Sequence, residues 1–254
     1  DTLTNFENLT GSAFNDSLTG SSGNNVIDGG LGDDTIDGGD GLDTASYASA
    51  TASVTVSLAL TSAQNTGGAG TDTLTNTENV TGSAFNDRLT GSGGNNVIAG
   101  GEGNDTIDGG SGDDTLDGGF GRDTLSFANA TAGVTVSLSV QTIQTTGGAG
   151  KVKLLPFGSL PTFENLAGSG YSDRLNGSNV ANLIEGGGGD DTLEGGDGND
   201  TLDGGDGIDT ASYASATASV TVSLAQASAQ NTGGAGTDTL TNFENLTGSA
   251  FNDS

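Results

Sequence analysis

Aspartates at a fixed spacing are the residues of this chain best suited to chemistry. They close the hexapeptide GGxGxD, which occurs ten times, and they recur every nine residues wherever the motif runs without interruption. Each brings a hard carboxylate oxygen beside several glycine carbonyls, and Ca²⁺ binds about six to eight oxygen ligands. The chain has no His and no Cys, so a zinc site is much less favoured. The motif therefore predicts calcium sites.

The rest of the nine-residue unit must position these aspartates. Its glycines stand where a tight turn needs positive φ and where the backbone must approach a bound group. Its eighth residue is aliphatic and has polar neighbours, as at Ile36, Ile107, Leu116 and Leu193. In a strand this alternation places one aliphatic side chain on one face. Nine residues therefore hold one turn and one strand of about three residues, which predicts a strand-turn solenoid.

Stacking of the units would bring the aspartates together. Two consecutive units complete one coil, so each unit stacks on the second unit after it. Because this places two carboxylates and several glycine carbonyls at one corner, repulsion between acids becomes a calcium-binding site.

The units resemble a known repeat. The runs GGEGNDTID GGSGDDTLD GGFGRDTLS from Gly100 and GGGGDDTLE GGDGNDTLD GGDGIDTAS from Gly186 are similar to the repeats-in-toxin (RTX) nonapeptide GGxGxDxUx, the hemolysin-type calcium-binding repeat of secreted bacterial proteins. The resemblance implies an all-β fold, a right-handed parallel β-roll with Ca²⁺ between stacked turns. It also implies type I secretion and calcium-driven folding outside the cell.

The resemblance also implies which atoms hold each ion. They are the Asp and the carbonyls of positions two and four of one turn, with the Asp and the carbonyls of positions one and three of the turn above. The fully matching pairs are Asp105 with Asp123 and Asp191 with Asp209. The predicted metal ligands are Asp34, Asp43, Asp105, Asp114, Asp123, Asp191, Asp200, Asp209, Gly30, Gly32, Gly101, Gly103, Gly118, Gly187, Gly189 and Gly204.

Other turns depart from the motif and are weaker candidates. Asn25, Asn96 and Asn182 stand where Asp is expected, and an amide offers a carbonyl oxygen but no charge, so pairs such as Asn96 with Asp114 should be weak or empty. The turns GSAFND and GSGYSD keep their acid but lack the second glycine. The weaker aspartates are Asp16, Asp87 and Asp173 in these turns, together with Asp72 and Asp238.

The blocks alternate with a second kind of segment. Residues 1–45, 82–126 and 168–212 carry the RTX-like blocks. In the segments 46–81, 127–167 and 213–254, alternation such as Val54, Val56 and Leu58 predicts half-buried strands. We expect these segments to be wider coils of one continuous solenoid over residues 1–254, because each has too few apolar residues for its own core.

Residues 151–162 interrupt the pattern. The string KVKLLPFGSLPT contains both prolines of the chain, and proline removes a ladder donor, so we expect an irregular loop. It is either a tolerated surface insertion or a small partner-binding loop that exposes Leu154, Leu155 and Phe157.

Composition narrows the function further. The net charge of −28 disfavours nucleic acid and anionic membranes as partners, and no apolar stretch is long enough to cross a bilayer. Without His or Cys the common catalytic triads are absent, and every acid that could be nominated for catalysis belongs to the repeating register, so no enzyme active site is expected. A permanently disordered Gly/Asp-rich linker is the alternative, but it would not keep aliphatic residues in nine-residue phase.

The sequence thus predicts a calcium-binding module that folds on calcium binding after type I secretion. We expect it to be a monomeric structural spacer in an extracellular or bacterial cell-surface protein. The alternative is a calcium-dependent adhesin segment that binds glycan, a surface or ice through outward Thr and Asn residues.

Overall fold

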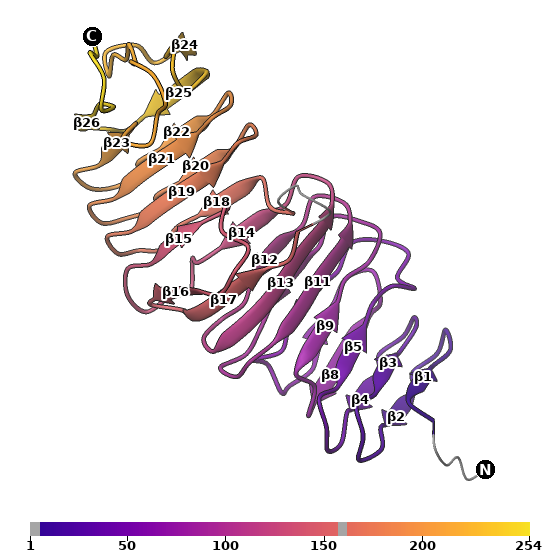
Figure 1. Cartoon of the computed structure of the whole chain (residues 1–254). Coiled ribbons are helices and arrows are strands. Elements are labelled where there is room, and N and C mark those ends of the chain that lie inside the picture. Colours follow the sequence, from indigo (N-terminus) through magenta and orange to yellow (C-terminus); the bar gives the residue numbers. More distant parts are fainter. Residues whose placement is uncertain (1–5, 157–161) are drawn as a thin grey trace. The chain divides into compact units, whose positions relative to one another are not determined.

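The computed structural model describes residues 6–156 and 162–254, and in these ranges the chain forms strands and turns without helices (Figure 1). It divides into two compact units, Asp1–Asp123 and Thr124–Ser254. Each unit is a stack of short parallel strands, the β-roll that the sequence predicts. That both units belong to one continuous solenoid remains a prediction.

In unit 1, three sheets run along the stack, with strand orders β1-β3-β5-β9-β11-β13, β2-β4-β8-β7 and β6-β10-β12. Their strands are β1 (Asn8–Thr10), β2 (Ser17–Thr19), β3 (Val26–Asp28), β4 (Thr35–Asp37), β5 (Thr44–Ser46), β6 (Thr55–Ser57), β7 (Gln64–Asn65), β8 (Thr71–Thr75), β9 (Asn79–Thr81), β10 (Arg88–Thr90), β11 (Val97–Glu102), β12 (Thr106–Asp108) and β13 (Asp113–Phe120).

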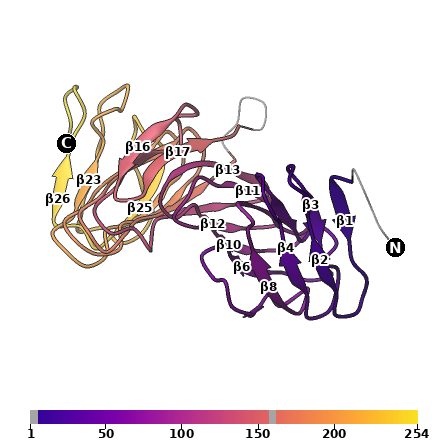
Figure 2. The ribbon, with the colours of Figure 1, turned by 90° about the horizontal axis from the view of Figure 1, so that it is seen from below.

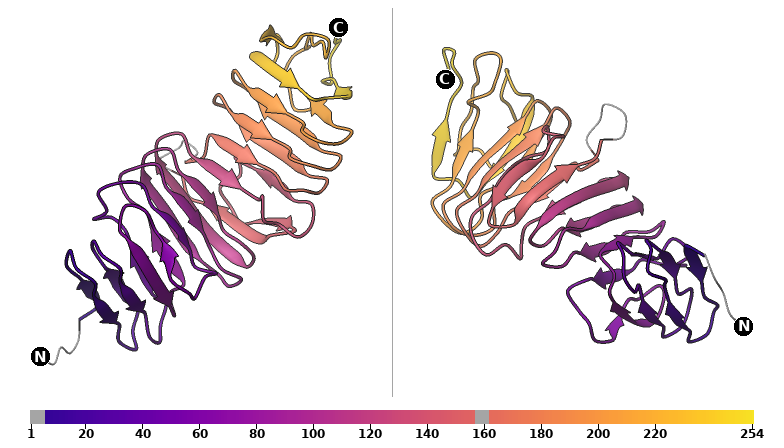
Figure 3. Two further views of the ribbon diagram at one scale, coloured as in Figure 1. Left: turned by 180° about the vertical axis from the view of Figure 1, so that it is seen from behind. Right: turned by 60° about the horizontal axis from the view of Figure 1, so that its bottom comes forward.

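In unit 2, the orders are β14-β18-β20-β22-β25-β24 and β15-β19-β21-β23-β26, with β16 beside β17. The strands are β14 (Thr124–Ser126), β15 (Thr135–Ser137), β16 (Gln144–Gly147), β17 (Gly150–Leu154), β18 (Asn165–Ala167), β19 (Arg174–Ser178), β20 (Leu183–Glu185), β21 (Thr192–Gly196), β22 (Thr201–Asp203), β23 (Thr210–Ser212), β24 (Gln230–Asn231), β25 (Thr237–Thr241) and β26 (Asn245–Thr247). Figure 3 shows these strands stacked side by side in successive coils.

The register confirms the coil of two nine-residue units. Ile98 pairs with Leu116 and Ile184 pairs with Leu202, so each aliphatic residue lies over its counterpart in the next coil. These four side chains are at most 1% exposed. Each strand therefore adds one residue to the core, as the alternation predicts.

The wider segments differ from simple longer coils. Val54, Val56, Val134 and Val136 are buried as predicted, but each segment also contains a short antiparallel pairing: β7 with β8, β16 with β17 and β24 with β25. Figure 2 shows β16 and β17 side by side. The chain turns back on itself there before it rejoins the parallel stack.

The prediction of an irregular loop over residues 151–162 is wrong for its first part. Residues 150–154 form β17, where Val152 and Leu154 are each 3% exposed. Leu154 is thus a core residue, because the alternation of Val152 and Leu154 places both on the inner face. Phe157, the third residue of the predicted exposed surface, lies outside the described residues.

In the described ranges, no helix is long and apolar enough to cross a membrane.

Candidate metal centre

The position-six residues form hydrogen-bonded ladders along two corners of each unit. In ten pairs, the Oδ1 atom of an aspartate accepts a hydrogen bond from the N–H of the equivalent residue one coil earlier. Asp105 donates to Asp123 and Asp191 donates to Asp209, both at 2.8 Å. The same bond joins Asp16 to Asp34, Asn25 to Asp43, Asp34 to Asp72, Asp87 to Asp105, Asn96 to Asp114, Asp173 to Asp191, Asn182 to Asp200 and Asp200 to Asp238.

The second oxygen, Oδ2, separates the aspartates into two groups. In one group it is buried and accepts no hydrogen bond from any described residue. We name this group the open aspartates: Asp34, Asp43, Asp105, Asp191, Asp200 and Asp209. Their side chains are at most 2% exposed. Since an unpaired buried acceptor costs roughly 1–3 kcal/mol, and more when charged, each position requires a cation or a proton.

The second glycine of the turn explains why this oxygen is open. Gly30, Gly101 and Gly187 adopt φ of 89°, 114° and 101°, a region that is unfavourable for residues with a Cβ. Where an Asp ends the preceding strand, the N–H of the second glycine donates to the carboxylate of that strand residue and not to the aspartate at position six. Gly30 donates in this way to Asp28 Oδ1 at 3.0 Å. The fourth glycines, Gly32, Gly103 and Gly189, also have positive φ.

In a second group, which we name the closed aspartates, the turn itself satisfies the carboxylate. They are Asp16, Asp87 and Asp173, all in turns with Ser at position two. Asp173 Oδ2 accepts the Ser169 N–H at 2.6 Å, and its Oδ1 accepts the Ser169 hydroxyl at 2.9 Å and the Val134 N–H at 2.7 Å. The closed aspartates therefore have no comparable need for a cation.

A second oxygen converges on each open carboxylate of the fully matching turns. A Cβ built on Gly100 would collide with Asp105 Oδ2 and with the carbonyl oxygen of Gly118. A Cβ on Gly186 would likewise collide with Asp191 Oδ2 and the carbonyl oxygen of Gly204. Glycine at position one thus leaves a space into which a carboxylate and a carbonyl of the next coil both point.

The asparagines at position six use their amide in place of a cation. Asn96 Nδ2 donates to the Glu78 carbonyl at 2.5 Å, and its Oδ1 accepts the Ser92 N–H at 2.7 Å. Asn25 and Asn182 make the same pair of bonds, donating to the carbonyls of Glu7 and Glu164. An amide that donates toward this corner replaces the positive charge that an aspartate would need.

Asp72 and Asp238 are also partly satisfied by side chains. Thr66 donates to Asp72 Oδ2 at 3.2 Å. Tyr213 and Thr232 donate to Asp238 Oδ2 at 3.0 Å and 3.4 Å. Both aspartates lie in GGAGTD turns, where the first glycine rather than the second has positive φ, as Gly67 and Gly233 show.

Two sets of ladder residues were not predicted from the sequence. Glu78 Oε2 accepts the Asp43 N–H at 3.0 Å, and Glu244 Oε2 accepts the Asp209 N–H at 2.9 Å, so a glutamate ends the ladder after the last GGxGxD turn. At position five, side-chain oxygens form a second ladder, as Asn104 does by accepting the Arg122 N–H at 2.9 Å. The recurring string EN in TENV and FENL is the signal that could have identified the glutamates.

Burial changes the acidity of several ladder carboxylates. Burial raises the pKa of Asp105, Asp114, Asp191 and Asp200 to about 7, although the hydrogen bond from the ladder N–H lowers the pKa. Burial also raises the pKa of Asp43, and the nearby carboxylate of Glu78 adds to this effect. By contrast, hydrogen bonds from the Ser249 side chain and the Val220 N–H hold the pKa of Asp253, in a GSAFND turn, below its usual range.

The donor set fits calcium. In the described ranges, no group of three or more acidic side chains is arranged to hold a metal ion by itself, so a bound metal would need backbone carbonyls as well as carboxylates. Paired carboxylates with carbonyls in a flexible oxygen cage are typical Ca²⁺ ligands. The buried, unpaired Oδ2 atoms are the feature of this structure that a cation would satisfy.

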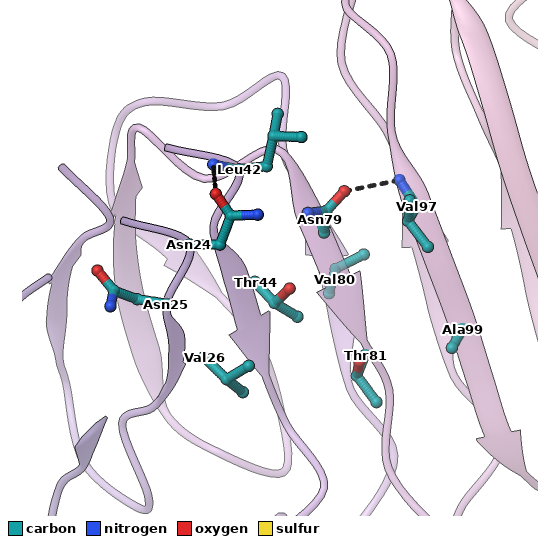
Figure 4. Close-up of a pocket in the computed structure, with 10 residues that line it drawn as sticks. All are labelled: Asn24, Asn25, Val26, Leu42, Thr44, Asn79, Val80, Thr81, Val97 and Ala99. Atoms are coloured by element: carbon teal, nitrogen blue, oxygen red, sulfur yellow. Dashed lines mark hydrogen bonds between the residues drawn. The ribbon is translucent and has the colours of Figure 1, made fainter. Parts of the chain in front are cut away.

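A separate pocket lies on the outer face of unit 1. Its volume is about 380 Å³, and it crosses β3, β5, β9 and β11 (Figure 4). Val26 and Val97, about half exposed, lie on its apolar surface. Asn24 Oδ1 accepts the Leu42 N–H at 3.0 Å and Asn79 Oδ1 accepts the Val97 N–H at 2.8 Å, which leaves both amide nitrogens as donors toward the pocket.

Comparison with known families supports the assignment of the repeats. The chain matches the RTX calcium-binding nonapeptide repeat in four copies, at residues 10–45, 75–106, 90–125 and 176–211. All the open aspartates lie within these ranges. No curated protein matches the chain.

Proposed function

Because this chain belongs to the RTX calcium-binding repeat family through these four segments, we propose that its stacked GGxGxD turns bind several Ca²⁺ ions and that this binding drives folding. The family assignment makes the chain a calcium-binding repeat module. The observation that supports the finer proposal is the row of open aspartates. A bound Ca²⁺ supplies the positive charge that these buried oxygens lack.

The residues that would hold the ions follow from the ladder. Asp105 with Asp123 and Asp191 with Asp209 would hold the strongest sites, with the glycine carbonyls of their turns. Asp34 and Asp200 would hold further sites with Asp72 and Asp238, since their own Oδ2 atoms are open. The closed aspartates and the asparagines would contribute weakly, because protein donors already bind their side-chain oxygens.

We further propose that the chain is a monomeric structural segment of an extracellular protein, exported unfolded. The net charge of −28 supports this proposal, because without calcium the chain must repel itself. Extracellular calcium modules bind with Kd of about 10⁻⁴ to 10⁻³ M, far above cytosolic calcium levels. The fold would then form only after export.

The decisive experiment measures calcium stoichiometry together with folding. Equilibrium dialysis should show several ions bound per chain, and far-UV circular dichroism should show the β signal rising over the same calcium range. Absence of bound calcium at millimolar concentration would refute the proposal.

The pocket of unit 1 supports a second candidate, an adhesin segment that binds glycan. Apolar side chains beside outward amide and hydroxyl donors suit a sugar ring with its hydroxyl groups. Ice is less suited, because the outward row Val26, Thr44, Asn79 and Val97 is chemically mixed. A glycan array run with calcium should show binding that Asn79→Ala abolishes, and a blank array would remove this candidate.

A further inference from the structure

The turn that stacks on the last GGxGxD turn of an RTX-like block has an unusual form. Only Asn76, Thr77 and Glu78 separate β8 from β9, so this turn has three residues where the motif has six. Asn242, Phe243 and Glu244 form the same short turn between β25 and β26. Neither contains a glycine, yet each stacks directly on a GGxGxD turn.

Asparagine replaces glycine at the start of the short turn. Asn76 and Asn242 have φ of 51° and 57°, a left-handed conformation that asparagine tolerates better than most residues. Asn76 Nδ2 donates to Asp37 at 2.8 Å, and Asn242 Nδ2 donates to Asp203 at 2.7 Å. These bonds hold the backbone in the conformation that directs the asparagine carbonyl at the turn below.

That carbonyl and an open carboxylate converge as they do in the matching turns. A Cβ on Gly38 would collide with the Asn76 carbonyl oxygen and lie 2.8 Å from Asp43 Oδ2. A Cβ on Gly204 would collide with the Asn242 carbonyl oxygen and lie 2.7 Å from Asp209 Oδ2. The arrangement at Gly100 and Gly186 is thus repeated with an asparagine carbonyl in place of a glycine carbonyl.

The glutamate takes the place of the second aspartate. Glu78 accepts the Asp43 N–H and Glu244 accepts the Asp209 N–H, the bond that an aspartate makes elsewhere in the ladder. The extra methylene of glutamate compensates for a turn that is three residues shorter. Asp43 and Asp209 are fully buried, and within the described part of the chain their Oδ2 atoms have no hydrogen-bond partner.

We propose that the short turns complete two additional Ca²⁺ sites, one formed by Asp43, Glu78 and the Asn76 carbonyl, the other by Asp209, Glu244 and the Asn242 carbonyl. This inference rests on the proposed calcium-binding function. Each site closes a block, so the last GGxGxD turn is not left with an unpaired carboxylate. The string TNxEN is then a calcium-binding signal that contains no glycine.

The test counts calcium ions bound to the full chain by equilibrium dialysis. Glu78→Gln and Glu244→Gln keep an oxygen that accepts the ladder N–H but remove the charge, so each variant should bind one ion fewer than wild type. Because ligand charge sets affinity, the altered site should weaken by roughly 10-fold or more. The double variant should bind two ions fewer.

A matched control and a second variant make the outcome decisive. Glu185→Gln removes the same charge at an exposed position of β20 and should leave the ion count unchanged. Glu78→Asp keeps the charge but shortens the side chain, and it should lose the ion as Glu78→Gln does. Wild-type ion counts in Glu78→Gln and Glu244→Gln would overturn this inference alone, whereas a wild-type chain that binds no calcium would overturn the proposed function.

Discussion

The turns that begin at Gly168 and Gly186 place an aspartate at the same position of adjacent coils, yet the two carboxylates meet different donors. In GSGYSD, Ser169 donates both its N–H and its hydroxyl to Asp173. In GGGGDD, Gly187 adopts positive φ, and Asp191 Oδ2 is left buried without a donor from the described chain. The residue at position two therefore decides whether the protein satisfies the carboxylate or leaves one of its oxygens without a donor.

The largest expected effect is the loss of the fold when calcium is removed. With excess chelator, the open aspartates have no cation, so most of the β signal in far-UV circular dichroism should disappear, and millimolar calcium should restore it. Identical β-rich spectra in chelator and in calcium would show that open and closed aspartates do not differ in their need for metal.

Exchanging the aspartates themselves tests the comparison directly. Asp191→Asn should bind fewer ions than wild type, because it removes charge from an open carboxylate. Asp173→Asn should keep the ion count but lose roughly 1–3 kcal/mol of unfolding free energy, because charge-assisted hydrogen bonds weaken. Dialysis and urea unfolding in saturating calcium separate the two effects. Equal ion counts in the two variants would contradict the division.

Exchanging position two should convert one kind of turn toward the other. Gly187→Ser places a Cβ at φ of 101° and against the Ser169 carbonyl, so it should cost about 1–3 kcal/mol and weaken calcium binding at Asp191. Ser169→Gly removes the hydroxyl donor to Asp173 and should make stability more dependent on calcium. Urea unfolding at several calcium concentrations measures both, and an unchanged calcium dependence in Ser169→Gly would argue against the role of position two.

Acid should partly replace calcium. The pKa of Asp105, Asp114, Asp191 and Asp200 is about 7 in the folded chain and near 3.8 in an ordinary environment. The metal-free fold thus binds more protons than the unfolded chain, and its stability is present below pH 4 and lost as the pH rises through 7. In chelator, β signal should increase from pH 7 to pH 5. With calcium, the same acidification should weaken ion binding, because protons compete for the carboxylates.

The smallest effect is expected at the position-five ladder. Asn86 accepts one backbone N–H from the next coil, at 2.9 Å, and lies on the exposed side of the turn. Asn86→Ala should cost about 0.5–1.5 kcal/mol and leave the ion count unchanged. A change in calcium stoichiometry in this variant would mean that the turn ligates calcium through a wider set of residues.

Much of the fold follows from the nine-residue phase. Residues such as Ile98 and Leu193 recur where a three-residue strand must bury one side chain, so coil size and core were predictable. The antiparallel pairs were not, because Gln64 and Asn65 in β7 have no alternation that marks a strand. Residues 151–154 were misread because the prolines lie after β17 rather than within it.

The motif predicts strong candidate metal ligands only where it is complete. It predicts Asp105 and Asp191 as ligands and Asp173 as a weaker candidate, but the donation from Ser169 depends on backbone torsion, which the pattern does not record. Glu78 was missed because its coil is separated from Asp43 by 35 residues rather than 18. The inserted wide segment breaks the period that made the other ladder partners visible.

The ladder also gives each unit a direction. In the Asp105–Asp123 and Asp191–Asp209 bonds, the N–H comes from the earlier coil and the carboxylate from the later one. The position-five ladder runs the other way, because Asn86 and Asn104 accept the N–H of the later coil. One end of such a stack therefore presents acceptors at position six and donors at position five, and the other end presents the reverse. Two copies placed end to end by a two-fold axis would oppose identical groups, whereas copies related by translation would match. The two ladders accordingly favour head-to-tail over head-to-head association of such units.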